Sequence, residues 1–194
     1  MLKKLLPKFI CTASVLVLLS SCGDADVGGG VGEFTTVTAS ASVATPRLES
    51  DVVTGNTCSD TGSTGGTVST DTVDVVVSSR ALFPTGNLNL LISKITVHYE
   101  PTRAGTPRLP DYFIATNQSI APGGTLTVPV PVVPEALKID LMSDPNLSNN
   151  LGLCSGQIFE YYVTVTFEMS EPGGNGKVQN VPASLNVAVA DRAA

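Results

Sequence analysis

The sequence predicts an all-β protein built as a two-sheet sandwich, and three observations support this prediction. Apolar side chains recur at every second position in several segments, which is the period of a strand with one buried face. The chain of 194 residues contains 18 glycines and 13 prolines, a composition that disfavours long helices and favours turns. Only 14% of the residues are charged, and no segment after residue 22 shows a convincing helical stripe.

The N-terminus carries the features of an export signal. Lys3, Lys4 and Lys8 form a basic start, and an apolar run of about 11 residues follows. A helix that spans a bilayer needs about 20 apolar residues, so this run has the length of a signal peptide instead. The run ends in Leu19-Ser20-Ser21-Cys22.

This ending resembles the lipobox of bacterial lipoproteins. The resemblance implies that residues 1–21 are removed and that Cys22 becomes the lipidated first residue, held to a membrane by two or three acyl chains. Residue 23 is Gly and not the Asp that often retains such proteins at the inner membrane, so the resemblance favours the outer membrane. The alternative is a plain secretory signal cleaved nearby, with Cys22 as a free or disulfide-bonded thiol.

The segment after Cys22 is rich in glycine and has no apolar periodicity. We interpret residues 22–33 as the lipidated cysteine and a flexible tether, and residues 34–194 as a single domain. The glycines at 28–30 and 32 are not followed by Gly-Lys-Ser/Thr, so a phosphate-binding loop is the weaker interpretation.

Seven segments of the domain carry the alternating pattern of a half-buried strand. The clearest runs from Phe159 to Met169, where Tyr161, Val163 and Val165 share one face. Half-buried strands are typical of antiparallel sheets. The seven predicted strands are residues 37–43, 72–78, 91–99, 125–132, 137–141, 159–169 and 184–189.

Turn chemistry agrees with this pattern. Gly123-Gly124 and the segment 172–176 (Pro-Gly-Gly-Asn-Gly) are turn sequences, and the second predicts a hairpin between the last two strands. Seven short strands resemble the immunoglobulin-like domains common on bacterial surface proteins, on strand number and spacing alone, since the chain has no Trp. A closed barrel is the alternative.

Two prolines predict the position of one strand. Pro129 and Pro131 lie two residues apart on the strand 125–132, so their missing N–H groups face the same lateral neighbour. A strand of this kind belongs at a sheet edge, where the prolines also hinder edge-to-edge aggregation.

Two cysteines remain after Cys11 leaves with the signal and Cys22 is used for lipid. Outside the cytoplasm we expect Cys58 and Cys154 to form a disulfide, with an upper stabilisation of about 4–5 kcal/mol from loop closure. No Cys-x-x-Cys spacing supports a redox pair instead.

Candidate binding residues are aromatic. We expect residues 100–123 to form a long loop, in which Tyr112 and Phe113 are candidates for partner binding, and Tyr162 is a candidate on the outer face of its strand. Tyr99 and Tyr161 fall on core faces by parity. The other interpretation of Tyr112 and Phe113 is that they cover an open end of the core.

Catalytic and metal chemistry have little support. His98, the only histidine, falls on a polar strand face, and no local pattern gives it a nucleophile or an orienting carboxylate. The oxygen-rich segment 140–157 suits Ca²⁺, but its residues are also ordinary turn formers and its spacing is not that of an EF-hand. We therefore predict no enzyme activity, no cofactor and no metal.

Charge limits the class of partner. The net charge is −6, and removal of residues 1–21 with their three lysines makes it about −9, which argues against nucleic acid. We expect a lipid-anchored envelope protein that acts as an interaction or structural module with a protein partner. A carbohydrate-binding or adhesive surface domain, facing polysaccharide, is the alternative.

Overall fold

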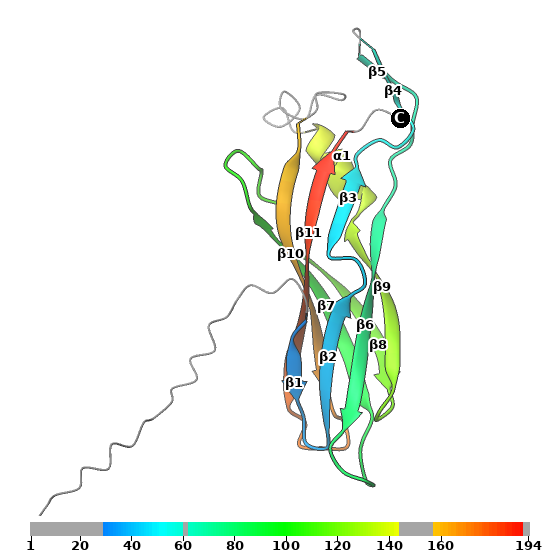
Figure 1. Ribbon diagram of the computed structural model, residues 1–194, viewed down its shortest axis with the longest axis vertical. Coiled ribbons are helices and arrows are strands. Elements are labelled where there is room, and N and C mark those ends of the chain that lie inside the picture. Colours follow the sequence, from blue (N-terminus) through cyan, green and yellow to red (C-terminus); the bar gives the residue numbers. More distant parts are fainter. Residues whose placement is uncertain (1–28, 60–61, 144–156, 192–194) are drawn as a thin grey trace, which may run out of the picture.

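The computed structural model describes residues 29–59, 62–143 and 157–191, and these form eleven strands and one helix (Figure 1). In chain order the elements are β1 (Val31–Glu33), β2 (Val37–Val43), β3 (Arg47–Asp51), β4 (Thr57–Ser59), β5 (Gly62–Thr64), β6 (Asp71–Ala81), β7 (Leu90–Pro101), β8 (Tyr112–Ile120), β9 (Thr125–Val133), α1 (Glu135–Ser143), β10 (Phe159–Ser170) and β11 (Val178–Ala190). None of the described helices is long and apolar enough to cross a bilayer.

The strands form two large sheets and one small hairpin. The four-stranded sheet has the order β1-β2-β6-β9, the five-stranded sheet has the order β3-β11-β10-β7-β8, and β4 pairs only with β5. The two large sheets lie face to face as the layers of a sandwich (Figure 1). The predicted all-β, two-sheet architecture is confirmed.

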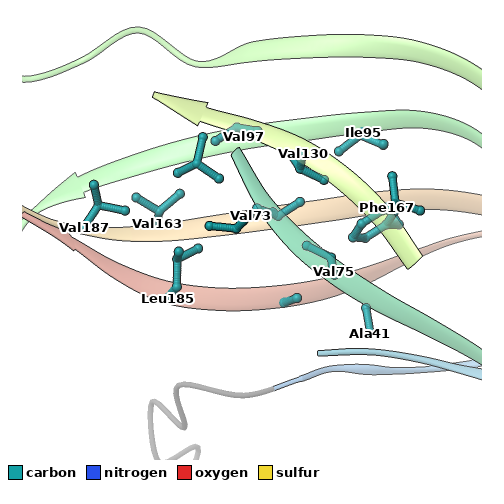
Figure 2. Close-up of a cluster of buried hydrophobic side chains, with 14 of the residues drawn as sticks. Ala41, Val73, Val75, Ile95, Val97, Val130, Val163, Phe167, Leu185 and Val187 are labelled. Atoms are coloured by element: carbon teal, nitrogen blue, oxygen red, sulfur yellow. The ribbon is translucent and has the colours of Figure 1, made fainter. Parts of the chain in front are cut away.

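One apolar core fills the space between the sheets. Figure 2 shows side chains of β2, β6 and β9 meeting side chains of β7, β10 and β11. Along β10 every second residue from Phe159 to Met169 is buried, as the alternation predicts. Tyr99 and Tyr161 are also buried, as their parity predicts. Each large apolar side chain removed from water in this way contributes about 1.5–3 kcal/mol.

Six of the seven predicted strands are confirmed, and the predicted strand at 137–141 is wrong. Residues 137–141 lie in helix α1. Leu137 and Leu141 are four residues apart, so they share a face in a helix as well as in a strand, and both are buried. Ile139 between them is 43% exposed, which a buried strand face would not allow.

The predicted long loop at 100–123 is also wrong over much of its length. Residues 112–120 form β8, which pairs antiparallel with β7. Polar residues interrupt the apolar alternation of this strand, because β8 lies at a sheet edge and buries little of its surface.

One strand pair departs from the predicted antiparallel arrangement. The chain leaves the four-stranded sheet after β2, passes Pro46, and joins the five-stranded sheet as β3, which runs parallel to β11. The Asn186 N–H donates to the Pro46 carbonyl at 2.9 Å, so pairing begins at the crossing point itself.

Residues 29–33, which we expected in the flexible tether, are part of the sandwich. β1 pairs with β2, and the Gly30 N–H donates to the Pro182 carbonyl of β11 at 2.7 Å. A Cβ on Gly29 would lie 2.1 Å from the Ala41 carbonyl oxygen, and one on Gly30 would lie 2.3 Å from a Pro182 ring carbon. These glycines are therefore needed for close packing. We call this flank, formed by residues 29–33 with β2 and β11, the closed side.

A buried carboxylate fastens the closed side. Glu171, at the start of the predicted β10–β11 hairpin turn, is 1% exposed. It accepts hydrogen bonds from the backbone N–H groups of Thr35 and Thr36 at 3.0 and 3.1 Å, and from the Thr36 hydroxyl. The β1–β2 turn is thereby tied to the β10–β11 turn.

A buried lysine holds α1 against both sheets. The Lys138 side chain is fully buried, and its ammonium donates to the Asp51 carbonyl oxygen of β3 at 2.6 Å. The same ammonium lies 2.9 Å from a carboxylate oxygen of Asp71 in β6. The helix is therefore fixed over one end of the sandwich, next to the start of β8.

Candidate interaction surface

The flank opposite the closed side carries two free sheet edges, which we call the open side. β8 ends the five-stranded sheet and β9 ends the four-stranded sheet. Among the described strands, neither has a second neighbour in its own sheet. Such edges expose backbone donors and acceptors that another strand can bind. Because the strands form two separate sheets, each with two end strands, the closed-barrel alternative is wrong.

The β9 edge is blocked. Pro129 and Pro131 lie opposite Asp74 and Thr72 of β6, at the edge position that their spacing predicts. Neither proline has an N–H to offer to an incoming strand. This strand therefore cannot form a full hydrogen-bond ladder on its outer side.

The β8 edge has no such protection at its start. Residues 112–120 contain no charged residue and no proline. The register with β7 shifts between Ile92 and Lys94, which leaves a straight paired segment from Tyr112 to Ala115. Phe113 lies in this segment and is 70% exposed, which is unusual for a large aromatic side chain on an edge strand.

The two adjacent aromatic candidates point in opposite directions. Tyr112 faces inward, where its ring centroid lies 6.4 Å from that of Tyr99, and Tyr99 in turn packs edge-on against Tyr161 at 6.2 Å. The Tyr99 hydroxyl donates to the Val132 carbonyl of β9, which connects the two sheets. Burial raises the pKa of Tyr112 to about 12, and it raises the pKa of Tyr99 and Tyr161 further.

A small hollow lies between the start of β8 and α1. Its volume is about 300 Å³, and Tyr112 forms one wall. Apart from Asp140, the lining is apolar or aromatic, which suits an apolar side chain from outside. The lining residues are Pro110, Tyr112, Pro134, Ala136, Leu137 and Asp140.

Phe113 and Tyr162 share the outward face of the five-stranded sheet. Phe113 lies opposite Thr96 of β7, and the half-buried Tyr162 lies on β10 opposite Glu100 of β7. On this face of β10, Thr166 lies in the row of Phe113, and Thr164 lies between that row and Tyr162. The structure thus brings two of the three aromatic candidates to one face and turns Tyr112 away from it.

The β7–β8 loop carries a carboxylate partner for His98 that the sequence analysis missed. The exposed His98 lies on a polar face as predicted, and its Nδ1 is 2.8 Å from the Asp111 carboxylate. The hairpin brings the two together across 13 positions, so no local spacing could indicate the pair. Among the described residues, the Asp111 carboxylate is the hydrogen-bond partner of the ring.

The hollow beside this loop has its ionic groups partly paired. Its volume is about 660 Å³, and its lining includes His98, Arg103, Arg108 and Asp111. The Arg103 guanidinium lies 2.9 Å from the Glu160 carboxylate. Within the described parts of the chain, no group of three or more potential metal ligands is present.

Several predicted sites lie outside the described residues. Cys22 and the whole of 1–28 fall there, as does Cys154, while Cys58 lies on β4. Lipidation of Cys22 and the Cys58–Cys154 disulfide therefore remain predictions. Most of the oxygen-rich segment 140–157 also lies outside, and Asp140 itself belongs to α1.

No protein-family model matches the chain, and no curated protein sequence matches it. Among solved structures, the chain is similar to the crystal structure of a protein from Archaeoglobus fulgidus, with 11% identity and a TM-score of 0.35. That match covers 62% of this chain and 88% of the other. At such a TM-score the likeness carries no argument about fold or function.

Proposed function

We propose that the protein is a lipid-anchored, non-enzymatic interaction module of a bacterial cell envelope, and that it binds another polypeptide at the β8 edge. The observation that carries this proposal is the contrast between the two free edges. Prolines block β9, whereas β8 starts with a straight, uncharged segment that exposes 70% of Phe113. Addition of a strand to such an edge is a common mode of protein recognition.

The anchor and the binding edge are on opposite flanks. If Cys22 carries the lipid, the six residues 23–28 join it to Gly29 on the closed side, and the seven steps of the chain from Cys22 to Gly29 span at most about 25 Å. The tether that we propose is therefore residues 22–28 and not residues 22–33, because residues 29–33 belong to the sandwich. It attaches the domain by its closed flank, which leaves β8 clear of the attachment point for a partner.

The finer assignment of the fold, an immunoglobulin-like sandwich, is also part of the proposal. Strands β2, β6 and β9 have the order of A, B and E in that fold, and β11, β10 and β7 have the order of G, F and C. On this assignment β3 continues the first strand alongside G, and β8 extends the sheet beyond C. Loops and edges of such sandwiches serve many unrelated partners, so the fold adds no ligand of its own.

Photo-crosslinking in native membranes tests the binding edge. A benzoyl-phenylalanine at position 113 is compared with the same probe at position 31, since Phe113 and Val31 are both 70% exposed but lie on opposite sides. We expect a specific crosslinked polypeptide from position 113 and none from position 31. Equal products from both positions, or none from 113, would contradict the proposal.

Attachment is tested separately. We expect Cys22→Ser to abolish acyl labelling and to release the protein from membranes, because the thiol is the acylation site. A labelled, membrane-bound Cys22→Ser protein would contradict the anchor. It would leave the β8 edge untested, and the crosslinking experiment addresses that point.

Polysaccharide binding is a second candidate, favoured by the shared outward face of Phe113 and Tyr162. Sugars stack on exposed aromatic rings, and Thr164 and Thr166 on the same face of β10 supply hydroxyl groups. Sedimentation of the protein with insoluble envelope polysaccharide would then depend on both rings. If Phe113→Ala and Tyr162→Ala leave the bound fraction unchanged, this candidate is wrong.

A further inference from the structure

We propose that the strand bound at the β8 edge is β8 of a second copy of this chain. The two strands would pair antiparallel across a two-fold axis and join two five-stranded sheets into one. This inference rests on the proposed function, because it names the partner at the same edge.

Charge does not oppose a second copy at this edge. The chain carries a net charge of −6, so two copies repel each other over most of their surfaces. Residues 112–120 have no ionisable group except the Tyr112 phenol, which burial keeps neutral up to a pKa of about 12. In a pairing centred on Phe113, Asp111 of one copy lies opposite the uncharged Ala115 of the other, so two acidic copies can approach along β8 without placing like charges opposite each other.

The pleat of the strand limits the register. In an antiparallel pair, two residues that lie opposite each other have their side chains on the same face of the sheet. If one residue lies opposite its own copy on the two-fold axis, every other opposed pair also meets this condition. The shift after Ala115 restricts pairing to the straight segment at the start of β8. The two registers that fit are centred on Phe113 or on Ile114.

The hollow beside α1 selects between these registers. With Phe113 at the centre, Ile114 of the second copy lies opposite Tyr112, next to the hollow of about 300 Å³. Ile114 is partly buried against its own core, so only its exposed part would meet the hollow. With Ile114 at the centre, the polar Thr116 takes that place. An apolar side chain matches the apolar lining, so we infer the register centred on Phe113.

This arrangement agrees with attachment of both copies to one membrane. A two-fold axis perpendicular to the joined sheet places the two closed sides on the outer flanks of the dimer, where both tethers begin. Pairing of about three residues of each copy, 112–114, makes an interface below about 1,000 Å², which is typical of a weak complex. Confinement to a surface raises the effective concentration, so the dimer should form on membranes more readily than in dilute solution.

Disulfide trapping of the full-length chain in membranes tests the register. Phe113→Cys is compared with Thr127→Cys, an exposed position on the blocked β9 edge, and with the parent chain as the baseline for the native cysteines. Because Phe113 of one copy would face Phe113 of the other, mild oxidation should convert most of Phe113→Cys into a covalent dimer. Thr127→Cys should behave like the parent.

A charge variant gives an independent measurement. In Phe113→Glu two carboxylates would face each other at the two-fold axis and the aromatic contact would be lost, so the dimer should weaken at least about tenfold. Thr127→Glu adds the same charge on β9 and should leave association unchanged. Since Phe113 is 70% exposed, both variants should keep the circular dichroism spectrum of the parent. Association is measured by sedimentation of detergent-solubilised protein, at a protein concentration at which the parent chain dimerises.

Three outcomes are distinguishable. A dimer trapped at position 113 and weakened by Phe113→Glu supports the second copy. Trapping of a different polypeptide at position 113 overturns the second copy but agrees with the proposed function. If position 113 traps no chain and Phe113→Glu does not change sedimentation, both the inference and the proposed binding edge are wrong.

Discussion

The closed side and the open side of the sandwich differ in how far their sheet edges are covered by other parts of the chain. On the closed side, residues 29–33 bridge β2 and β11, and the buried Glu171 fixes the turn that follows. On the open side, β8 and β9 end their sheets without a further strand among the described residues. Glycines make the first side tight, whereas prolines protect only one edge of the second.

The difference shows how one small domain can separate attachment from recognition. On the closed side the N-terminal segment pairs with both sheets, because β1 pairs with β2 while Gly29 and Gly30 pair with β11. β3 is the end strand of the five-stranded sheet on this side. The β8 edge keeps its backbone groups free next to an exposed aromatic ring. Three predictions test this contrast, in order of decreasing effect on stability.

The largest effect is expected from removal of the carboxylate that fastens the closed side. Glu171→Ala leaves the N–H groups of Thr35 and Thr36 without their acceptor, so the free energy of unfolding should fall by about 2–4 kcal/mol. Urea unfolding checks this, with Glu33→Ala on the exposed face of β1 as the control. A change of less than about 0.5 kcal/mol would show that the turn does not depend on Glu171.

Alkaline pH should destabilise the fold in part through Tyr112 on the open side. An unfolded tyrosine has a pKa near 10, and burial raises the pKa of folded Tyr112 to about 12. The folded state therefore holds its proton more tightly, so this contribution is complete below pH 10 and is lost as the pH rises from about 10 to about 12. Urea midpoints at several pH values check this.

Tyr112→Phe sharpens the same test, because phenylalanine has no proton to lose. The variant should lose less stability than the parent between about pH 10 and about pH 12. An identical pH dependence of the two proteins would mean that Tyr112 is not desolvated beside Tyr99.

The smallest effect on stability is expected at the blocked edge. Pro129→Ala restores one backbone N–H on the outer side of β9, and the loss of the proline ring changes the free energy of unfolding by less than about 1 kcal/mol. Self-association measured by light scattering should nevertheless increase, whereas Pro84→Ala in the exposed β6–β7 loop should leave it unchanged. A stability loss of several kcal/mol would mean that Pro129 packs inward.

Strands that bury one face were predictable, because burial imposes the two-residue period. Phe159 to Met169 is the clearest example, and Pro129 with Pro131 correctly marked an edge. Residues 137–141 were mistaken for a strand because positions four apart share a face in both structures. A segment of this length is too short to distinguish the helical period of 3.6 residues from the strand period of two residues.

The two sides of the sandwich depend on tertiary contacts and were harder to predict. Nothing in the sequence distinguishes a glycine in a tether from Gly30, which is required by the close approach of Pro182. β8 was mistaken for a loop because an edge strand needs few apolar residues. The exposure of Phe113 on a strand, and the inward direction of Tyr112, became visible only once that strand was placed.

Amide hydrogen exchange of the membrane-bound protein tests the central claim most directly, because it needs no knowledge of the partner. If β8 binds another strand, amides of residues 112–115 should exchange more slowly in native membranes than in dilute purified protein, while those of residues 125–131 in β9 should not change. Equal exchange of residues 112–115 in both states, or slower exchange confined to β9, would contradict the account.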